Sequence, residues 1–352
     1  MLRFFILMLL VVVLAAGEPP LDPAVQAACK RGAAWLASKC DKDGQVTAGQ
    51  GKSTATTGLA ALALAGIGVL PTSPGAEGAA AKRMLEWLLQ DARCDNNGYY
   101  GARDGSAMYG HGIIALYFAE MLGMGVDAAS DRRIRARLER AIAVILWAQA
   151  RKGRDNVKQF GGWRYGPDSG DSDLSVTAWQ LLALRAAKQA GLNVDKQPID
   201  DAVQYLRRCY QSERDAQGNP KRAVSGAAYQ PGGGPTYAMA AAGMLSLQVA
   251  GAYDLPEVQG SAAWLKACVI KPDMPWFFYG TYYYSQGMHI AGGIYADLAW
   301  KKVPELLLPL QKGDGRWESG WNEERSAGPV YASSMALLAL AVQYRCLPIY
   351  QR

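Results

Sequence analysis

The sequence contains few of the residues that build metal sites or nucleophilic active sites. Histidine occurs twice in 352 residues. None of the six cysteines belongs to a Cys-x-x-Cys pair, which argues against a zinc ribbon or a thioredoxin-like site. A nucleophile elbow, a Ser–His–Asp order and a thioester-forming segment are also missing. The glycine run at 232–235 does not match a phosphate-binding fingerprint. We therefore expect no metal ion and no cofactor.

Charge is sparse as well. Only 19% of the residues are charged and 50% are hydrophobic, which excludes disorder for the bulk of the chain. The net charge is +6, and no dense basic run stands out beyond 131–140, so nucleic acid is not an expected partner. Glycine (39) and proline (17) are too few for a collagen-like or low-complexity protein.

The N-terminal residues predict export. A short basic start precedes an unbroken apolar run at 4–14, and small residues follow at 15–17. This is the organisation of a signal peptide over 1–17, cleaved after Gly17, ahead of a single domain at 18–352. The exported chain would be periplasmic or secreted, with no transmembrane segment after cleavage. The alternative is a retained N-terminal membrane anchor, although the run is shorter than the roughly 20 residues that span a bilayer.

Helical periodicity dominates the rest of the chain. Even-numbered helices are apolar all round, as in the segment 57–62, whereas odd-numbered helices carry charge on one face and an aromatic–leucine pair on the other. A helix that is apolar all round is buried. We therefore predict an all-α (α/α)6 toroid of six inner and six outer helices, with the inner N-termini and the long glycine-rich loops on one face. The twelve helices are expected at 23–40, 54–67, 75–91, 107–123, 131–151, 173–190, 198–213, 235–251, 256–270, 279–293, 296–311 and 329–345.

The cysteines fall at helix ends of the expected ring. Export permits disulfides, and neighbouring positions at one end of a closed ring would pair. The alternative is six free thiols. We predict the disulfides Cys29–Cys346, Cys40–Cys94 and Cys209–Cys268.

Repeated glutamine–tryptophan segments resemble those of a known superfamily. The copies are 306–311 with 314–317, then 146–149 with 161–163, and 84–90 with Gly98 and Tyr99, where tyrosine replaces tryptophan. They resemble the QW repeat of squalene–hopene and other terpenoid cyclases, and the chain looks like one toroid of the prenyltransferase and squalene oxidase repeat superfamily. The C-terminal pattern at 344–350 is similar to that of an exported bacterial subgroup of uncertain activity.

This resemblance implies a candidate acid. Terpenoid cyclases that start by protonation use an Asp-x-Asp-Asp motif, and Asp171 and Asp173 match its first two acids, with Asp173 as the proton donor. Leu174 stands in place of the third acid. Protonating an alkene needs a desolvated carboxyl that its surroundings keep protonated. The alternative is that Ser172 or Asp173 caps the following helix.

The two histidines are further candidates. His111 and His289 occupy similar positions in two inner helices on opposite sides of the expected ring, where each could act as a base. Prenyltransferase β subunits hold zinc in this toroid through Asp, Cys and His, but no cysteine here lies at an inner-helix pocket position. The alternative for both histidines is a packed, hydrogen-bonded side chain.

Aromatic residues are concentrated on the face that carries the long loops. They could line a lumen that stabilises carbocations or holds an apolar chain. The resemblance implies an exported terpenoid cyclase-like protein that cyclises or binds an isoprenoid. One alternative is a non-catalytic exported binding or scaffold protein, with a protein partner on the loop face. Another is a secreted polysaccharide lyase or glycosidase. The candidate substrate-binding residues are Tyr109, Trp163, Tyr165, Trp179, Tyr237, Tyr282, Trp317 and Tyr331.

Overall fold

The computed structural model describes residues 21–47, 51, 53–124, 127–151 and 156–350. The signal peptide predicted at 1–17 lies outside these residues. The described part is all-α, with only isolated bridges between extended residues. Within it, no helix has both the length and the apolar character needed to cross a bilayer.

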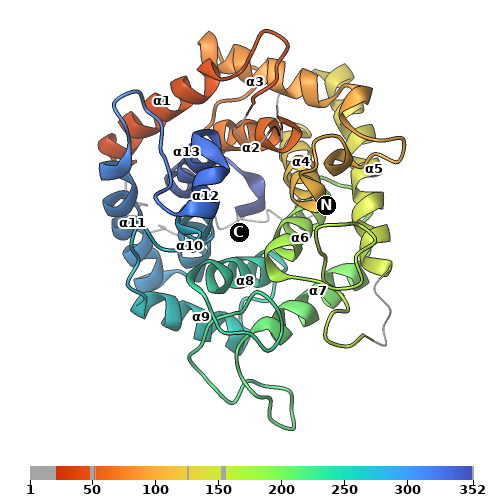
Figure 1. Cartoon of the computed structure of the whole chain (residues 1–352), viewed down its shortest axis with the longest axis vertical. Helices are drawn as coiled ribbons and strands as arrows, with labels where there is room; N and C mark the ends of the chain where they lie inside the picture. Colours follow the sequence, from red (N-terminus) through yellow and green to blue (C-terminus); the bar gives the residue numbers. More distant parts are fainter. Residues whose placement is uncertain (1–20, 48–50, 52, 125–126, 152–155, 351–352) are drawn as a thin grey trace, which may run out of the picture.

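The helices form two concentric layers (Figure 1). Each inner helix contacts its inner neighbours, and α13 contacts α2, so the ring is closed. Each of the predicted helices is present, differing by a few residues at its ends, and the short α12 (Asn322–Ser326) was not predicted. The outer helices are α1 (Pro23–Ser38), α3 (Gly75–Leu88), α5 (Ala128–Ala150), α7 (Lys196–Cys209), α9 (Pro256–Ala267) and α11 (Gly293–Leu307). The inner helices are α2 (Ser53–Gly66), α4 (Ala107–Met121), α6 (Leu174–Gln189), α8 (Tyr237–Val249), α10 (Phe277–Ala291) and α13 (Gly328–Leu340).

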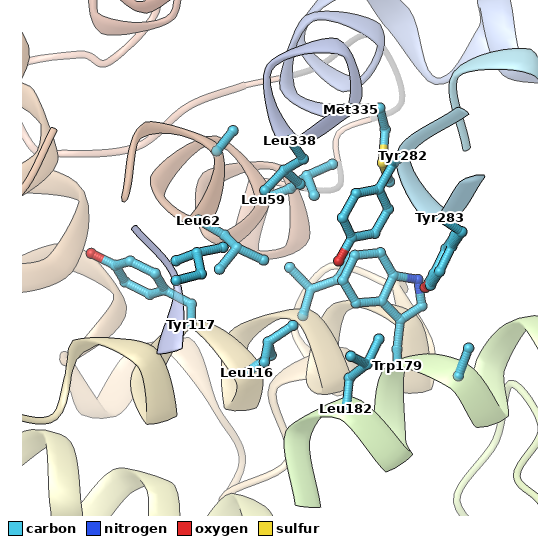
Figure 2. Close-up of a cluster of buried hydrophobic side chains, with 14 of the residues drawn as sticks. Leu59, Leu62, Leu116, Tyr117, Trp179, Leu182, Tyr282, Tyr283, Met335 and Leu338 are labelled. Atoms are coloured by element: carbon cyan, nitrogen blue, oxygen red, sulfur yellow. The ribbon is translucent and has the colours of Figure 1, made fainter. Parts of the chain in front are cut away.

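Large side chains fill the centre of the ring, and we call this group the axial core. Leu59, Leu116 and Met335, each on a different inner helix, point toward Trp179 and Tyr282, which come from two further inner helices (Figure 2). The rings of Trp179 and Tyr282 stack at 5.8 Å, and all five side chains are at most 3% exposed. Because these side chains are buried against one another, this part of the ring has no open lumen.

The glutamine–tryptophan segments make the same contacts in two copies. Gln149 Nε2 donates to the carbonyl of Gly161 at 2.8 Å, and Gln311 Nε2 donates to that of Gly315 at 2.9 Å. Both glycines have positive φ, and a Cβ on either would meet a backbone carbonyl of an outer helix at 2.5 Å or less. The indoles of Trp163 and Trp317 each donate to an outer-helix carbonyl at 2.8 Å. In both copies the tryptophan therefore fastens the loop to an outer helix.

In the third copy the equivalent aromatic residue is Tyr100 instead of Tyr99. Its hydroxyl donates to the carbonyl of Leu88 at 3.2 Å, as the indoles do in the other copies. Its backbone N–H donates to His111 Nδ1, in the way that the Trp163 and Trp317 N–H groups donate to Thr177 and Ser333 hydroxyls.

The C-terminal segment 347–350 closes one end of the ring. It runs into the middle of the toroid (Figure 1), where Tyr350 hydrogen-bonds with Tyr282. The N–H of Ile349 donates to Glu120 Oε2 at 3.4 Å, and Gln189 Nε2 donates to the Pro348 carbonyl at 3.1 Å. Glu120 and Gln189 lie near the C-terminal ends of their helices, so this segment covers the face opposite the long loops.

The predicted disulfides are wrong for this structure, in which all six cysteines are free thiols. The side chains of Cys40 and Cys94 have different neighbours. Cys40 Sγ lies 3.8 Å from the Ala80 carbonyl on α3, whereas Cys94 Sγ accepts from Arg137 Nη1 on α5 at 3.5 Å.

The other two predicted pairs also bond elsewhere. Tyr205 and Arg208 are the polar neighbours of the Cys209 thiol, and Lys302 is the charged neighbour of Cys268. In the third pair, Cys29 and Cys346 both contact Tyr344. Cys29 contacts its side chain, and Cys346 Sγ donates to its carbonyl at 3.5 Å.

Candidate functional site

Polar and aromatic side chains gather on the loop face where α6 begins. We call Tyr109, Arg164, Tyr165, Asp171, Asp173 and Tyr229 the rim cluster. Three segments supply them: the start of α4, the loop from 161 to 173, and the loop that precedes α8. The N–H of Met108 donates to the carbonyl of Tyr165 at 2.9 Å, which fastens the loop to α4.

Asp173 is the fully buried member of the rim cluster, and it caps α6. Its Oδ1 accepts from the N–H of Val176 at 2.9 Å and from the hydroxyl of Ser175 at 2.5 Å. Burial raises the pKa of Asp173 above its usual value, while these bonds and the charge of Arg164 act in the opposite direction. Asp173 therefore is the N-cap of α6, as the capping alternative expected. Its raised pKa is also compatible with an acid role.

Arg164 joins the two carboxylates of the candidate motif. Its Nε lies 3.5 Å from Asp171 Oδ2, and its Nη1 lies 3.5 Å from Asp173 Oδ2. Nη1 also donates to the hydroxyl of Tyr229 at 3.1 Å. The guanidinium lies 4.7 Å from the ring of Tyr165 and 5.4 Å from that of Tyr229, so it is close to both aromatic rings.

Two hydroxyl contacts complete the rim cluster. The Tyr165 and Tyr229 hydroxyls are 2.5 Å apart, and Tyr109 hydrogen-bonds with the hydroxyl of Ser175. Tyr165 is 42% exposed and the Asp171 side chain is 49% exposed, so both can reach a ligand from solvent. Asp173 itself is not exposed to solvent.

Carboxylates cap alternate inner helices around the same face. Asp104 Oδ2 accepts from the N–H groups of Thr54 and Ala55 at the start of α2. Glu324, buried on α12, accepts from the N–H groups at the start of α10 and from a serine hydroxyl. An acid at a helix N-terminus is stabilised by the unpaired N–H groups and the helix dipole. The position of Asp173 therefore follows a structural pattern of this ring.

His111 lies between the two layers and faces the outer helix α5. Its Nδ1 accepts from Tyr100 and its Nε2 donates to the carbonyl of Ala141 at 2.9 Å, which requires the neutral form with the proton on Nε2. Burial lowers its pKa to about 4. These contacts match the packed, hydrogen-bonded alternative.

His289 lies near the C-terminal end of α10, away from the loop face. It lines a cavity of about 360 Å³ together with Gln286 and Tyr350. The two candidate histidines are therefore not brought together. Nowhere in the described ranges do three or more His, Cys, Asp or Glu side chains gather in a group that could hold a metal ion.

The remaining aromatic candidates divide by position. Trp179 and Tyr282 belong to the axial core, and Tyr237 donates to Thr281 between α8 and α10. Trp163 and Trp317 are buried between the layers, where they bond outer-helix carbonyls. Of the predicted substrate-binding residues, the ones with solvent access are thus on the loop face: Tyr109, Tyr165 and the half-buried Tyr331.

Sequence reasoning missed Arg164 and Tyr229. Arg164 stands between two aromatic residues that were selected, but a single arginine gives no periodic signal. Tyr229 comes from a loop 65 residues away from Arg164, and only the closed ring brings the two together.

No protein-family model and no curated protein matches the chain. Solved structures do match its fold. An α-1,6-mannanase from Salegentibacter, solved with α-1,6-mannotriose, has a TM-score of 0.63 at 8% identity, over 92% of this chain and 99% of that one. A D-mannose isomerase has a TM-score of 0.55 at 13% identity, over 91% and 97%.

A type II terpene cyclase, MstE from Scytonema, was solved with geranylgeranyl dihydroxybenzoate. It has a TM-score of 0.51 at 16% identity, over 92% of this chain and 98% of that one. The chain is an α/α toroid protein. The toroid is shared by proteins with different chemistries, so the likeness gives the fold, and function has to be argued from the rim cluster.

Proposed function

We propose that this toroid is an exported binding protein whose rim cluster holds an oligosaccharide at the loop face. The observation that carries the proposal is the partly exposed pair Tyr165 and Tyr229, with Arg164 close to both rings and Asp171 beside it. Aromatic faces with polar edges suit a ligand that has apolar ring faces and many hydroxyls. Arg164 and Asp171 supply a donor fork and an acceptor for those hydroxyls.

A polar groove is formed by the end of α7 and the loop that precedes α8, the loop that also supplies Tyr229. It has a volume of about 660 Å³ and is lined by Arg208, Glu213, Lys221 and Arg222 among others. Gly232 also lines it, three residues beyond Tyr229. Charged and polar walls favour a hydrated ligand such as a saccharide over a hydrocarbon chain.

The filled axial core argues against a chamber for a long isoprenoid. The rings of Trp179, Tyr282 and Tyr283 pack against one another where such a chain would have to lie. Opening a chamber would mean separating buried aromatic side chains, each of which contributes about 1.5–3 kcal/mol by burial.

A glycan array followed by titration calorimetry tests the proposal. We expect neutral or acidic oligosaccharides to bind, and Tyr165→Ala to weaken binding at least tenfold. The matched control is Trp147→Ala, because Trp147 is an aromatic residue 50% exposed on the outer wall, and its loss should leave binding unchanged. Absence of any glycan ligand would reject the proposal, and equal effects of the two variants would place the site elsewhere.

Export belongs to the same proposal and is supported by the predicted signal peptide at 1–17. We expect a chain expressed from Met1 in a bacterial host to appear outside the cytoplasm. Its measured mass should be that of a chain whose first residue is Glu18. A membrane-bound chain that keeps residues 1–17 would support the anchor alternative instead.

Cyclisation of an isoprenoid is the second candidate function. It is favoured by the burial and raised pKa of Asp173 and by the tyrosines that surround it. The test is gas chromatography–mass spectrometry after incubation with squalene and shorter isoprenoids, with Asp173→Asn as the comparison. A cyclic product that disappears in the variant would replace the binding proposal, whereas the absence of product leaves Asp173 as a helix cap.

A further inference from the structure

We propose that the cavity beside the C-terminal segment, on the face opposite the loops, binds a small amphipathic carboxylic acid. The cavity has a volume of about 360 Å³. This falls at the lower end of the range of roughly 300–1,000 Å³ that is typical of small-molecule sites. An acid of about 12 non-hydrogen atoms, such as a medium-chain fatty acid, fits this volume.

Part of the cavity lining is apolar. Ile290, Ala341, Val342 and Leu347 contribute to its walls, and each is buried by the surrounding helices. These residues come from the end of α10, from the turn after α13 and from the C-terminal segment. They offer a surface on which a hydrocarbon chain or ring loses contact with water.

Another part of the lining is polar and consists of Arg345, His289, Gln286 and Tyr350. Arg345 supplies a permanent positive charge and a planar donor fork that matches a carboxylate. A lining that combines apolar surface with a cationic side chain favours an amphipathic anion.

The backbone at Arg345 supports a specific role for this side chain. Its φ is 54°, in the left-handed region that residues other than glycine adopt rarely. Such a conformation is energetically unfavourable and persists only where the surrounding structure enforces it. Here it is kept at a residue that lines the cavity.

The C-terminal segment makes the cavity a preformed one. Leu347 and Tyr350 form part of its wall, and the segment is fixed by the contacts of Tyr350 with Tyr282 and of Ile349 with Glu120. A preformed wall lowers the ordering cost of binding.

Cysteine alkylation gives a direct test. Cys346 lines the cavity and is half-buried, whereas Cys268 is similarly exposed and does not line it. We expect saturating decanoate to slow the reaction of Cys346 with iodoacetamide at least fivefold, measured by peptide mass spectrometry, while Cys268 reacts at an unchanged rate. 2-Naphthoate serves as a second probe that distinguishes an aromatic acid from a fatty acid.

The head group and the charge are tested separately. Decanol should protect Cys346 at least tenfold less effectively than decanoate. Arg345→Asn removes the charge but tolerates the left-handed backbone, and it should raise the Kd of decanoate about tenfold. Arg325→Asn, on the loop face, is the matched control. The proposal is wrong if neither acid protects Cys346, or if decanol protects as well as decanoate.

Discussion

Asp173 combines a structural and a chemical feature in one side chain. It caps α6 through Val176 and Ser175, and it is buried beside Arg164. The sequence allowed both a cap and an acid at this position, since both are favoured by a helix N-terminus. The contacts of the carboxylate account for its burial without any catalytic step. Its oxygens accept hydrogen bonds from Ser175 and Val176, and Arg164 provides an opposite charge.

Removing this cap should destabilise the protein more than removing an exposed one. We expect Asp173→Ala to lower the free energy of unfolding by about 2–3 kcal/mol, since it leaves buried donors without an acceptor. The matched control is Asp127→Ala, which removes the exposed cap of α5 and should cost about 1 kcal/mol. Urea denaturation measures both. Equal losses would mean that the buried contacts of Asp173 add nothing.

Glu120 makes the stability dependent on pH. Burial raises its pKa to about 8 from an ordinary value of 4.5, so between these values the folded protein keeps a proton that the unfolded chain releases. The stabilisation is complete below pH 4.5 and is lost as pH rises through 8. Tyr282 and Tyr350 lie next to this carboxyl and stay neutral in that range.

We therefore expect the wild type to lose stability relative to Glu120→Gln from pH 6.5 to 8, by at most about 1.4 kcal/mol per pH unit. This window lies above the range in which neutral, buried His111, with a pKa of about 4, gives the opposite slope. Denaturation curves at several pH values measure the difference. Parallel pH profiles for the two proteins would contradict the assignment to Glu120.

At the scale of elements, the loops carry the repeat as much as the helices do. A glutamine at the end of an outer helix, a glycine with positive φ and an aromatic residue two positions later recur around the ring. The aromatic residue bonds the outer helix, and its N–H bonds a side chain of the inner helix. Each loop thereby joins one outer helix to the next inner helix.

The glutamine of this repeat should be important for stability. Gln149 Nε2 donates to the carbonyls of Gly161 and Pro198, both at 2.8 Å. Gln149→Leu keeps the volume but leaves two carbonyls unpaired, and we expect a loss of about 1–3 kcal/mol in the free energy of unfolding. Gln159, near the rim, is not a suitable control because it bonds Ser172. Gln197→Leu, on the exposed face of α7, should change stability by less than 0.5 kcal/mol.

If Gln149→Leu and Gln197→Leu change the free energy of unfolding equally, the repeat does not depend on this bond. The same substitution at Gln311 extends the test to ring closure, because Gln311 Nε2 also donates to the carbonyl of Ala28 on α1 at 2.9 Å. Its loss should resemble that of Gln149→Leu.

At the scale of the whole molecule, closure of the ring comes from packing and hydrogen bonds, with the cysteines as thiols. We expect the denatured, unreduced protein to titrate six thiols. In the native protein only the half-buried Cys268 and Cys346 should react readily, because the other four are buried. A denatured chain without titratable thiols would restore the disulfide prediction.

The sequence by itself determined the alternation of buried and amphipathic helices, and with it the toroid. Helical periodicity is a local property of the sequence. A helix such as α2 that is apolar all round is stable in a globular protein only when it is buried. The glutamine–tryptophan segments could also be located from the sequence, because each is a short local pattern that repeats along the chain.

Tertiary structure alone decided the rest. Arg164 meets Tyr229, and the C-terminal segment meets Glu120, across sequence separations of 65 and 229 residues. The cysteine partners and the filled axial core depend on side-chain directions that a one-residue rotation of a helix would change. Such contacts are set by the packing of all six helix pairs at once, and no local pattern in the chain encodes them.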